Sequence, residues 1–240
     1  MGKYLKGAAA FALAVSLSVS AQAALITTLT FDNISANKVA DATAGEAQLS
    51  VELRSVDGQA SQAQFVFLNS GPLASSITDI YFDDRTVLGA PGGNGDGVLA
   101  DLLTLSSTSG GVSFSEGASP PNLPAANGAD PDFVVSTGLL ADSNAPTQPN
   151  GVNPGENLSA FFLLEANKTI GDVLNSLLAG TLRIGIHVQG FTGGGSESFV
   201  NNPPGGGGTD PDNEVPEPAM LGLLGLGLLG LAGMRRRKAG

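Results

Sequence analysis

Apolar and polar residues alternate in several short stretches of this chain, which is the pattern of half-buried β-strands. In residues 48–54 and 182–188 every second side chain is apolar. Similar short runs predict further strands at residues 25–31, 64–68, 77–82, 99–105 and 158–164. Gly, Pro, Asn and Asp are frequent between these runs, as tight turns require. The pattern therefore predicts an all-β fold.

One stretch has the helical period instead. Residues 169–180 place apolar side chains at positions 170, 173, 174, 177 and 178. Thr169 can cap the first turn together with Asp172 at the third helical position, and Gly180 can end the helix. We therefore expect a single jelly-roll-like β-sandwich domain over residues 24–200 with one short helix.

The first residues have the three parts of a secretory signal peptide. Lys3 and Lys6 precede an apolar stretch at residues 8–19, and Ala21-Gln22-Ala23 supplies two small residues around the cleavage position. We expect signal peptidase to remove residues 1–23, so that the exported protein begins at Ala24. The chain has no cysteine and forms no disulfide after export.

The last residues combine a linker, a proline motif, an apolar run and a basic cluster. Residues 201–214 are mostly Gly, Pro, Asn and Asp and contain no apolar side chain large enough to pack, so they predict a linker. The following motif is formed by Val215, Pro216, Glu217 and Pro218. Residues 219–234 carry no charge, and the basic cluster after them is formed by Arg235, Arg236, Arg237 and Lys238.

The apolar run at residues 219–234 is short for a permanent membrane anchor. As a helix it would be roughly 24 Å long, against a hydrocarbon core of about 30 Å. The four cations would stay on the cytoplasmic side and leave the residues before Val215 outside. A plain anchor with a short helix is one interpretation. The two prolines favour another, because they keep residues 216–218 extended and accessible.

The order of these parts resembles the PEP-CTERM sorting signal, which the exosortases of Gram-negative bacteria are thought to recognise. The resemblance implies processing at residues 215–218 by an exosortase-type enzyme. It also implies an intermediate tethered transiently to the inner membrane, and then a place in the cell envelope, on the surface or in the extracellular matrix. Residues 77–83, 151–156, 182–191 and 195–199 are similar to exported PEP-CTERM proteins of unknown function, which adds no known activity.

The expected domain is acidic, whereas the charged residues at the two ends of the chain are mostly basic. Residues 24–214 contain five basic and 21 acidic side chains, a net charge of −16. Such a surface disfavours nucleic acid and anionic lipid as partners, and it favours cations or neutral polymers such as exopolysaccharide.

Residue types that usually carry catalysis are scarce, and we expect no enzymatic activity and no cofactor. Strand alternation places the single histidine, His187, with Arg183 on the polar face, where we expect both to meet solvent. Residues 194–198 read Gly-Gly-Ser-Glu-Ser, so they lack the final glycine of a nucleophile elbow. Without cysteine, cysteine proteases and thiolate metal sites are excluded.

A structural calcium ion is a separate hypothesis, because oxygen-rich loops suit this ion. Its expected ligands are Asp83, Asp84, Asp96 and Asp101, although the side chains of Asp83 and Asp84 should point to opposite faces of a strand. The spacing of an EF-hand loop is absent.

Two functions follow from these observations. The first is an exported structural protein of the envelope or of the biofilm matrix. The alternative is a carbohydrate- or calcium-binding surface module delivered by the same route. Sugar sites usually stack a sugar ring on an exposed aromatic side chain. Tryptophan is absent, and Tyr4 and Tyr81 are the only tyrosines. The sequence therefore favours the first function.

Overall fold

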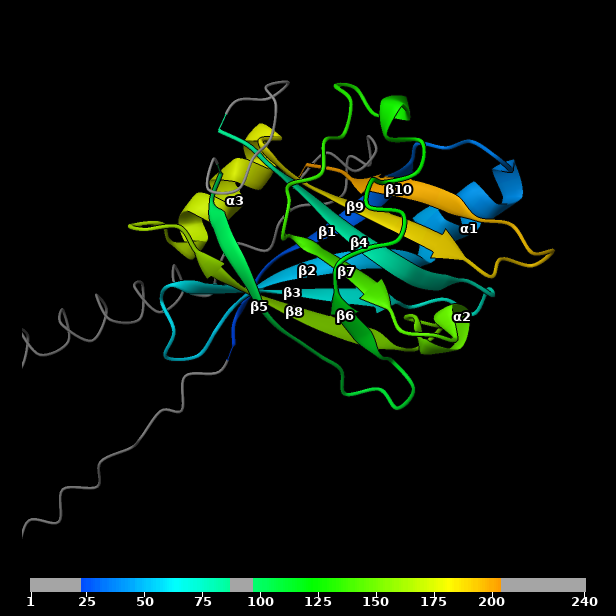
Figure 1. Ribbon diagram of the computed structural model, residues 1–240, viewed down its shortest axis with the longest axis horizontal. Coiled ribbons are helices and arrows are strands. Elements are labelled where there is room, and N and C mark those ends of the chain that lie inside the picture. The colour runs from blue at the N-terminus through cyan, green and yellow to red at the C-terminus, as the bar shows by residue number, and fades with distance from the viewer. Residues whose placement is uncertain (1–22, 87–96, 204–240) are drawn as a thin grey trace, which may run out of the picture. The chain divides into compact units, whose positions relative to one another are not determined.

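The computed structural model describes residues 23–86 and 97–203, and in these ranges the chain consists mainly of β-strands (Figure 1). The chain divides into two compact units, residues 1–206 and 207–240, and every described residue belongs to the first. The strands are β1 (Leu25–Asn33), β2 (Leu49–Ser55), β3 (Gln62–Asn69), β4 (Ser76–Asp84), β5 (Leu99–Ser106), β6 (Phe114–Glu116), β7 (Leu140–Ser143), β8 (Asn157–Leu164), β9 (Leu182–Gln189) and β10 (Glu197–Asn201). The helices are α1 (Val39–Gln48), α2 (Thr147–Asn150), α3 (Ile170–Ala179) and a short 3-10 helix (Ala126–Gly128).

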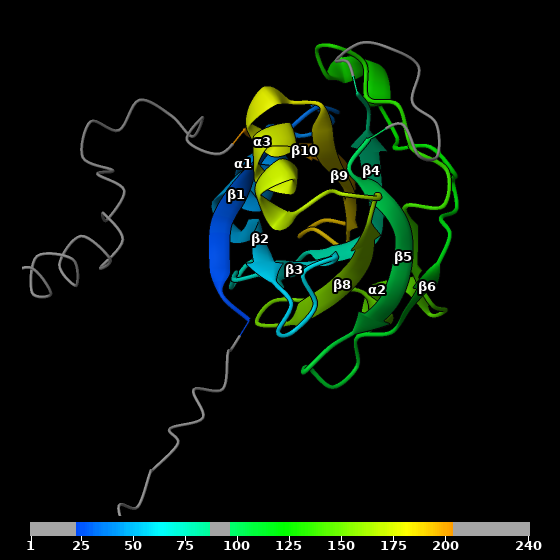
Figure 2. The ribbon, with the colours of Figure 1, turned by 90° about the vertical axis from the view of Figure 1, so that its left-hand side faces the viewer.

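These strands form one antiparallel sheet in the order β5-β8-β3-β2-β1-β10-β9-β4-β7-β6. β1 joins two halves of the sheet, because residues 27–30 pair with β2 and residues 31–33 pair with β10. Figure 2 shows the strands of both halves curving around a common interior. The all-β prediction is confirmed, and the two packed layers are halves of a single continuous sheet.

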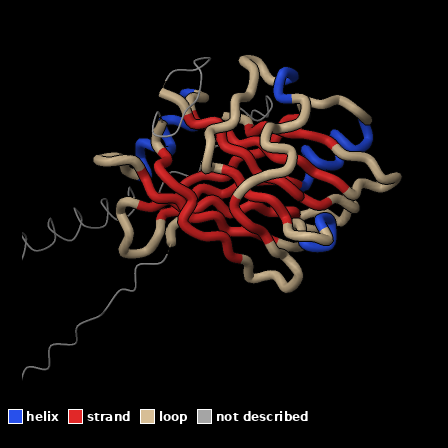
Figure 3. Tube along the Cα trace, in the orientation of Figure 1, coloured by secondary structure: helices blue, strands red, loops and turns tan. Residues whose placement is uncertain are grey.

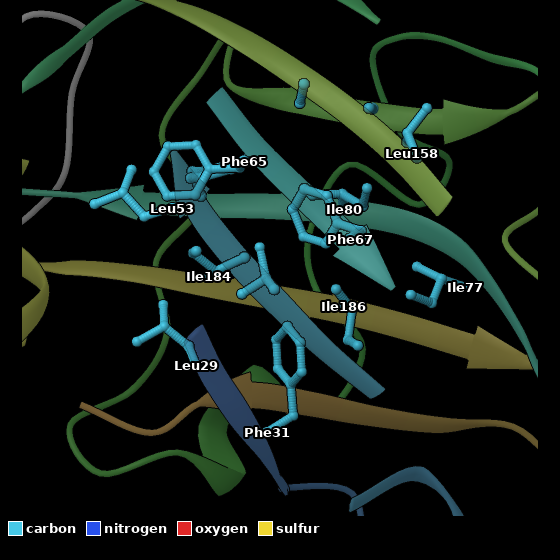
Figure 4. Packing of buried hydrophobic residues seen from close by; sticks show 14 of the residues in the cluster. Leu29, Phe31, Leu53, Phe65, Phe67, Ile77, Ile80, Leu158, Ile184 and Ile186 are labelled. Carbon is cyan, nitrogen blue, oxygen red and sulfur yellow. The ribbon is translucent and has the colours of Figure 1, made fainter. Parts of the chain in front are cut away.

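Phenylalanine rings fill the space between the two halves. The ring of Phe82 on β4 lies 5.2 Å from that of Phe65 on β3 and 4.6 Å from that of Phe162 on β8. Leucine and isoleucine side chains, among them Leu53 and Ile184, belong to the same buried cluster as Phe65 (Figure 4). The core therefore depends on contacts between strands that are distant in the sequence.

The expected helix is confirmed together with its ends. The Thr169 side chain accepts a hydrogen bond from the backbone N–H of Asp172, and the Asp172 carboxylate accepts one from the backbone N–H of Thr169. Gly180 ends the helix with a φ of 70°, a conformation that favours glycine. Val173 and Leu177 are the buried residues of α3, which packs against β3 and β9.

Helix α1 and the strands β6, β7 and β10 were not predicted. α1 carries alanine and glycine where most helices carry large apolar side chains, so its periodic signal is weak. It lies close to β10, and a Cβ atom at Gly45 would come within 2.2 Å of the Phe199 ring. The three strands have three to five residues each, too few to show an alternating pattern. Figure 3 shows the helices at the margins of the strand layers.

Among the described residues, no helix combines the length and the apolar character that a membrane crossing requires. The predicted apolar helix at residues 219–234 lies outside the described ranges, as do residues 1–22.

We expect Phe82→Ala to lower the free energy of unfolding by about 3–5 kcal/mol, because it leaves a cavity among three other rings. Phe161→Ala is the matched control, since Phe161 precedes Phe162 on β8 and is only half-buried. It should cost about 1 kcal/mol. Urea denaturation followed by circular dichroism measures both values, and equal losses would contradict this account of the core.

Candidate functional site

Polar side chains of β4 and β9 gather on the outer face of the sheet, where a loop covers them. We call residues 118–135 the cover segment. Its Leu123 and Phe133 pack with Tyr81 of β4 in a second, smaller apolar cluster. In Figure 1 the green chain leading to β7 passes over β4 and β9. All nine residues of β4 are buried, although successive side chains point to opposite faces.

The expectation that Arg183 and His187 face solvent is therefore wrong. The Arg183 residue is 8% exposed, and the His187 side chain is 12% exposed. Alternation assigned both residues to the correct face of β9. The error was to assume that water covers this face.

Asp83 is the centre of a buried ionic cluster on this face. Its carboxylate accepts hydrogen bonds from the guanidinium groups of Arg85 and Arg183, including one of 3.2 Å from Nε of Arg183. It also accepts the backbone N–H of Val134 at 3.1 Å. The Asp83 side chain is completely buried. A carboxylate at this depth is stabilised only because these donors replace water.

The same arginines hold the cover segment through its backbone. Arg183 donates to the carbonyl oxygens of Pro131 at 2.6 Å and Asp132 at 2.7 Å. Arg85 donates to the Asp132 carbonyl oxygen at 3.0 Å. The Phe133 ring lies 5.3 Å from the Arg183 guanidinium carbon, within the range of a cation–π contact. The cluster therefore fastens the loop to the sheet.

Asp84 points to the other face and binds backbone groups. Its carboxylate accepts the N–H of Val98 at 2.9 Å and that of Leu99 at 2.7 Å, where β5 begins. Gly97 permits this approach, because a Cβ atom there would lie 2.0 Å from the carboxylate. Burial raises the pKa of Asp84 to about 6, although the two backbone hydrogen bonds oppose the shift.

A row of titratable side chains crosses three neighbouring strands. Asp142 of β7 is in register with Asp79 of β4, which is in register with His187 of β9. Nδ1 of His187 lies 3.1 Å from Oδ2 of Asp79. Burial, and then the negative charge of the neighbouring Asp79 carboxylate, raise the pKa of Asp142. Oδ1 of Asp79 is buried without a hydrogen-bond partner among the described residues.

This row also has contacts with the cover segment. Asp142 accepts a backbone hydrogen bond from Ser119, and the Tyr81 hydroxyl donates to the Pro120 carbonyl oxygen at 2.9 Å. Burial, followed by the charges of Asp79 and Asp142, raises the pKa of Tyr81. The hydroxyl of Tyr81 therefore stays protonated and keeps this bond.

Ser198 is in register with His187 on the neighbouring strand β10, so Ser198, His187 and Asp79 follow one another across the sheet. A nucleophile must bond to its base, and in the described part of the chain Oγ of Ser198 is buried without a hydrogen-bond partner. Ser196 directly precedes β10, so residues 194–198 do not form a strand–turn–helix elbow. The arrangement holds the cover segment, but among the described residues it presents no accessible nucleophile.

The three expected calcium ligands that the structure describes, Asp83, Asp84 and Asp101, do not form a common site. Asp83 binds arginines and Asp84 binds backbone N–H groups, on opposite faces as predicted. Asp101 is exposed on β5, and Asp96 lies outside the described residues. Within residues 23–86 and 97–203, no group of three or more acidic or histidine side chains is arranged to hold a metal ion.

The predicted export and sorting residues lie mostly outside the described ranges. These are Ala21, the motif at residues 215–218 and the basic cluster at residues 235–238. Ala23 and Ala24 are described, and the backbone N–H of Ala24 donates to Oγ of Ser55 at 2.9 Å. The predicted cleavage position therefore directly precedes the first residue that is bonded into the sheet.

A cavity of about 440 Å³ lies where the end of β1, the last turn of α3 and residues 128–131 meet. Its polar lining residues include Asp32, Asp130 and Asn202, which the sequence did not predict to lie together. No local motif marks them, because strand pairing and the cover segment bring them together. Only a prediction of the loop's path could have found them.

We expect Asp83→Asn to lower the free energy of unfolding by about 3–5 kcal/mol, because two buried guanidinium groups lose their shared counter-charge. Asp57→Asn is the control, since Asp57 is exposed between β2 and β3, and it should change stability by less than about 0.5 kcal/mol. Denaturant titration gives both values. A loss below about 1 kcal/mol for Asp83→Asn would show that the ionic cluster does not hold the cover segment on the sheet.

We expect stability to increase as the pH falls from 7.5 to 5. The pKa of Asp84 is about 6 in the folded protein and about 3.8 when exposed, so the folded state takes up a proton that the unfolded state does not. The gain from this group is on the order of 1 kcal/mol. Asp142 acts in the same direction.

Glu197 limits the gain at lower pH. Its hydrogen bonds with Ser35 and Asn33 lower its pKa despite burial, so stability is lost as the pH falls below about 4.5. Melting temperatures across this pH range test both statements. In Asp84→Asn the increase between pH 7.5 and 5 should become smaller, and an unchanged increase would contradict the assignment to Asp84.

Comparison with known proteins concerns the C-terminal residues. Residues 214–238 match the family model of the PEP-CTERM protein-sorting motif. The match contains the proline motif, the apolar run and the basic cluster. Searches of curated proteins and of solved structures gave no match. The motif is consistent with sorting by an exosortase toward the extracellular side. The chain therefore carries a PEP-CTERM protein-sorting motif after its folded β-domain.

Proposed function

We propose that this chain is an exported structural protein of the cell envelope or the extracellular matrix, delivered and processed through its PEP-CTERM motif. The observation that carries the proposal is the match at residues 214–238, after an all-β domain that ends its last strand at Asn201. In this scheme signal peptidase cleaves before Ala24. The apolar run then holds the protein in the inner membrane until an exosortase-type enzyme acts at residues 215–218.

The construction of the domain supports a role outside the cell. It has no cysteine, so its stability is independent of the redox state of the compartment. Buried ionic contacts fasten its longest irregular segment, and phenylalanine rings join its two halves. The strongly acidic exterior keeps such a protein soluble among uncharged polysaccharides.

The alternative of a carbohydrate- or calcium-binding module has weaker support. Tyr81, the tyrosine available for stacking on a sugar ring, is completely buried beneath the cover segment. Asp83 and Asp84 already have their oxygens engaged. Calcium binding can be tested directly. If the protein binds calcium, its melting temperature should be higher in millimolar calcium than in a chelator, and equal melting temperatures would contradict the hypothesis.

Intact-mass measurement on protein from its native host tests the processing. We expect the chain to begin at Ala24 and to end near residues 216–218, with or without an added group. Replacing both prolines, with Pro216→Ala and Pro218→Ala, should keep the tail and leave the protein in the membrane fraction. Thr209→Ala in the preceding linker is the control and should be processed normally.

A mass that still includes residues 235–240 in the unaltered protein would contradict processing and leave a membrane-tethered protein. The structural role has its own readout. Deleting the gene should weaken or thin the matrix, as measured by rheology or microscopy of surface-grown cells. A matrix indistinguishable from that of the parent strain would contradict that role.

A further inference from the structure

The two edge strands of the sheet, β5 and β6, border one groove. The order of the sheet ends with β5 on one side and β6 on the other, and among the described residues no ladder joins these two strands. Two hollows of about 240 Å³ and about 290 Å³ lie between them, and both hollows are lined by Leu105 of β5 and Phe114 of β6. Figure 2 shows β5 and β6 next to each other. We call residues 102–107 and 112–116 the edge groove.

The hydrogen bonds of β6 to its neighbour β7 show which of its backbone groups are free. Ser113 and Gly117, on either side of β6, bond to the backbone of residues 144 and 140. In an antiparallel ladder, residues that bond to the partner strand alternate with residues whose N–H and C=O groups point away from it. Ser115 therefore bonds to β7, whereas the backbone groups of Phe114 and Glu116 point away from β7, on the side of the edge groove.

The same alternation identifies the free backbone groups of β5. The N–H of Leu164, at the end of β8, donates to residue 61 beside β3, so the even positions of β8 bond to β3 and the odd positions bond to β5. Residues 159 and 161 are in register with Ser106 and Thr104. Leu105 lies between these two residues and directs its N–H and C=O groups away from β8. Both irregularities of the β5–β8 register lie before Thr104, so the strand is regular at Leu105.

The free backbone groups of these three residues have no other partner among the described residues. The serine hydroxyl groups beside them are already engaged. Ser107 donates to the carbonyl oxygen of residue 157, Ser115 donates to the side chain of Asn144, and Ser113 accepts from the same side chain. Unpaired backbone N–H and C=O groups are therefore the main polar groups that the edge groove offers, and another extended backbone matches them best.

The side chains of the edge groove add an apolar surface to these backbone groups. Leu105 and Phe114 are half-buried and pack against the main core. Leu103 is 44% exposed. Lysine and proline often prevent an edge strand from pairing with another chain, and β5 contains neither. An added strand would cover these apolar side chains and gain hydrophobic contact.

Charge indicates which strand fits. Glu116 of β6 and Asp101 of β5 are exposed, and no basic residue lines either hollow. A second copy of the chain would bring the same acidic edges and would be repelled. A strand with lysine or arginine among its outward side chains would be attracted instead.

We propose that the edge groove binds an extended, basic segment of another polypeptide as an added β-strand. The segment pairs with the free backbone groups of Leu105 on β5 and of Phe114 and Glu116 on β6, and main-chain hydrogen bonds of this kind supply affinity in other proteins that add a strand to a sheet edge. Its apolar side chains alternate with polar and basic ones, because successive side chains of a strand point to opposite faces. This inference does not depend on the structural role proposed above.

Fluorescence anisotropy with a labelled heptapeptide tests the proposal on the intact chain. The probe alternates valine with lysine or threonine, so it has one apolar and one basic face. The matched control carries N-methyl groups on two adjacent central residues, so that each of its edges loses one N–H while charge and side chains are kept. We expect the control to bind at least about tenfold more weakly. Equal binding of the two peptides, or no binding of either, would overturn the proposal.

Hydrogen–deuterium exchange locates the bound peptide. We expect slower exchange at the backbone N–H of Leu105, at those of Phe114 and Glu116, or at both edges, because the added strand accepts hydrogen bonds from them. Residues 62–69 of β3, which is paired on both sides, serve as the internal control and should exchange at the same rate with and without the peptide. Slower exchange confined to segments outside the edge groove would contradict the proposal.

Charge reversal tests the choice of partner. At low ionic strength Glu116→Lys should weaken binding of the lysine peptide by about three- to tenfold, because an attraction becomes a repulsion. Asp57→Lys makes the same change of charge at an exposed position between β2 and β3 and should leave the affinity nearly unchanged. Circular dichroism confirms that each variant is folded. Equal effects of the two variants would show that binding reflects only the net charge, against the proposal.

Two other occupants of the edge groove give different results. If the chain alone forms dimers in sedimentation and the edge groove exchanges slowly without the peptide, a second copy fills the groove and the proposal is wrong. Maltohexaose is a neutral sugar chain, and its displacement of the peptide would identify a carbohydrate groove and would also overturn the proposal. Slow exchange that appears only with the peptide, and no competition by maltohexaose, is the expected result.

Discussion

The buried carboxylate of Asp83 determines how the outer face of the sheet can be covered. β4 and β9 carry Asp79, Asp83, Arg183 and His187 on this face, and none of these side chains could be buried there without partners. The Asp83 carboxylate forms ion pairs with two guanidinium groups. These groups also donate hydrogen bonds to the carbonyl oxygens of residues 131 and 132. A polar strand face and an irregular loop thereby satisfy one another.

The cover segment buries the outer face of β4 as well as its inner face. With the cover segment in place, β4 is buried on both faces and behaves as a central layer rather than as the outside of a sandwich. The aliphatic and aromatic core lies on one side, and a layer of hydrogen-bonded and charged side chains lies on the other. Residues 128–131 and Arg183 also line the cavity at the end of α3, so the ionic cluster borders that cavity.

Local sequence signals predicted the parts of the fold that depend on local physics. The alternation in residues 48–54 and 182–188 identified β2 and β9, and the capping pair Thr169 and Asp172 identified α3. The same alternation could not say what lies over the polar face, because the covering loop is some fifty residues away and has no period of its own. His187 was therefore assigned to solvent. The calcium hypothesis counted nearby acidic residues, whereas partners distant in the sequence decide how Asp83 and Asp84 are used.

The position of β10 has a mechanical consequence. This last strand lies between β1 and β9 and is hydrogen-bonded to both, rather than at an edge of the sheet. A force applied through the residues that follow Asn201 would load both ladders of hydrogen bonds at once. It would also have to pull the buried ring of Phe199 out of the core. When the domain is held by this end, β10 cannot separate until both ladders break. The strand next to the sorting segment is therefore well placed to bear load.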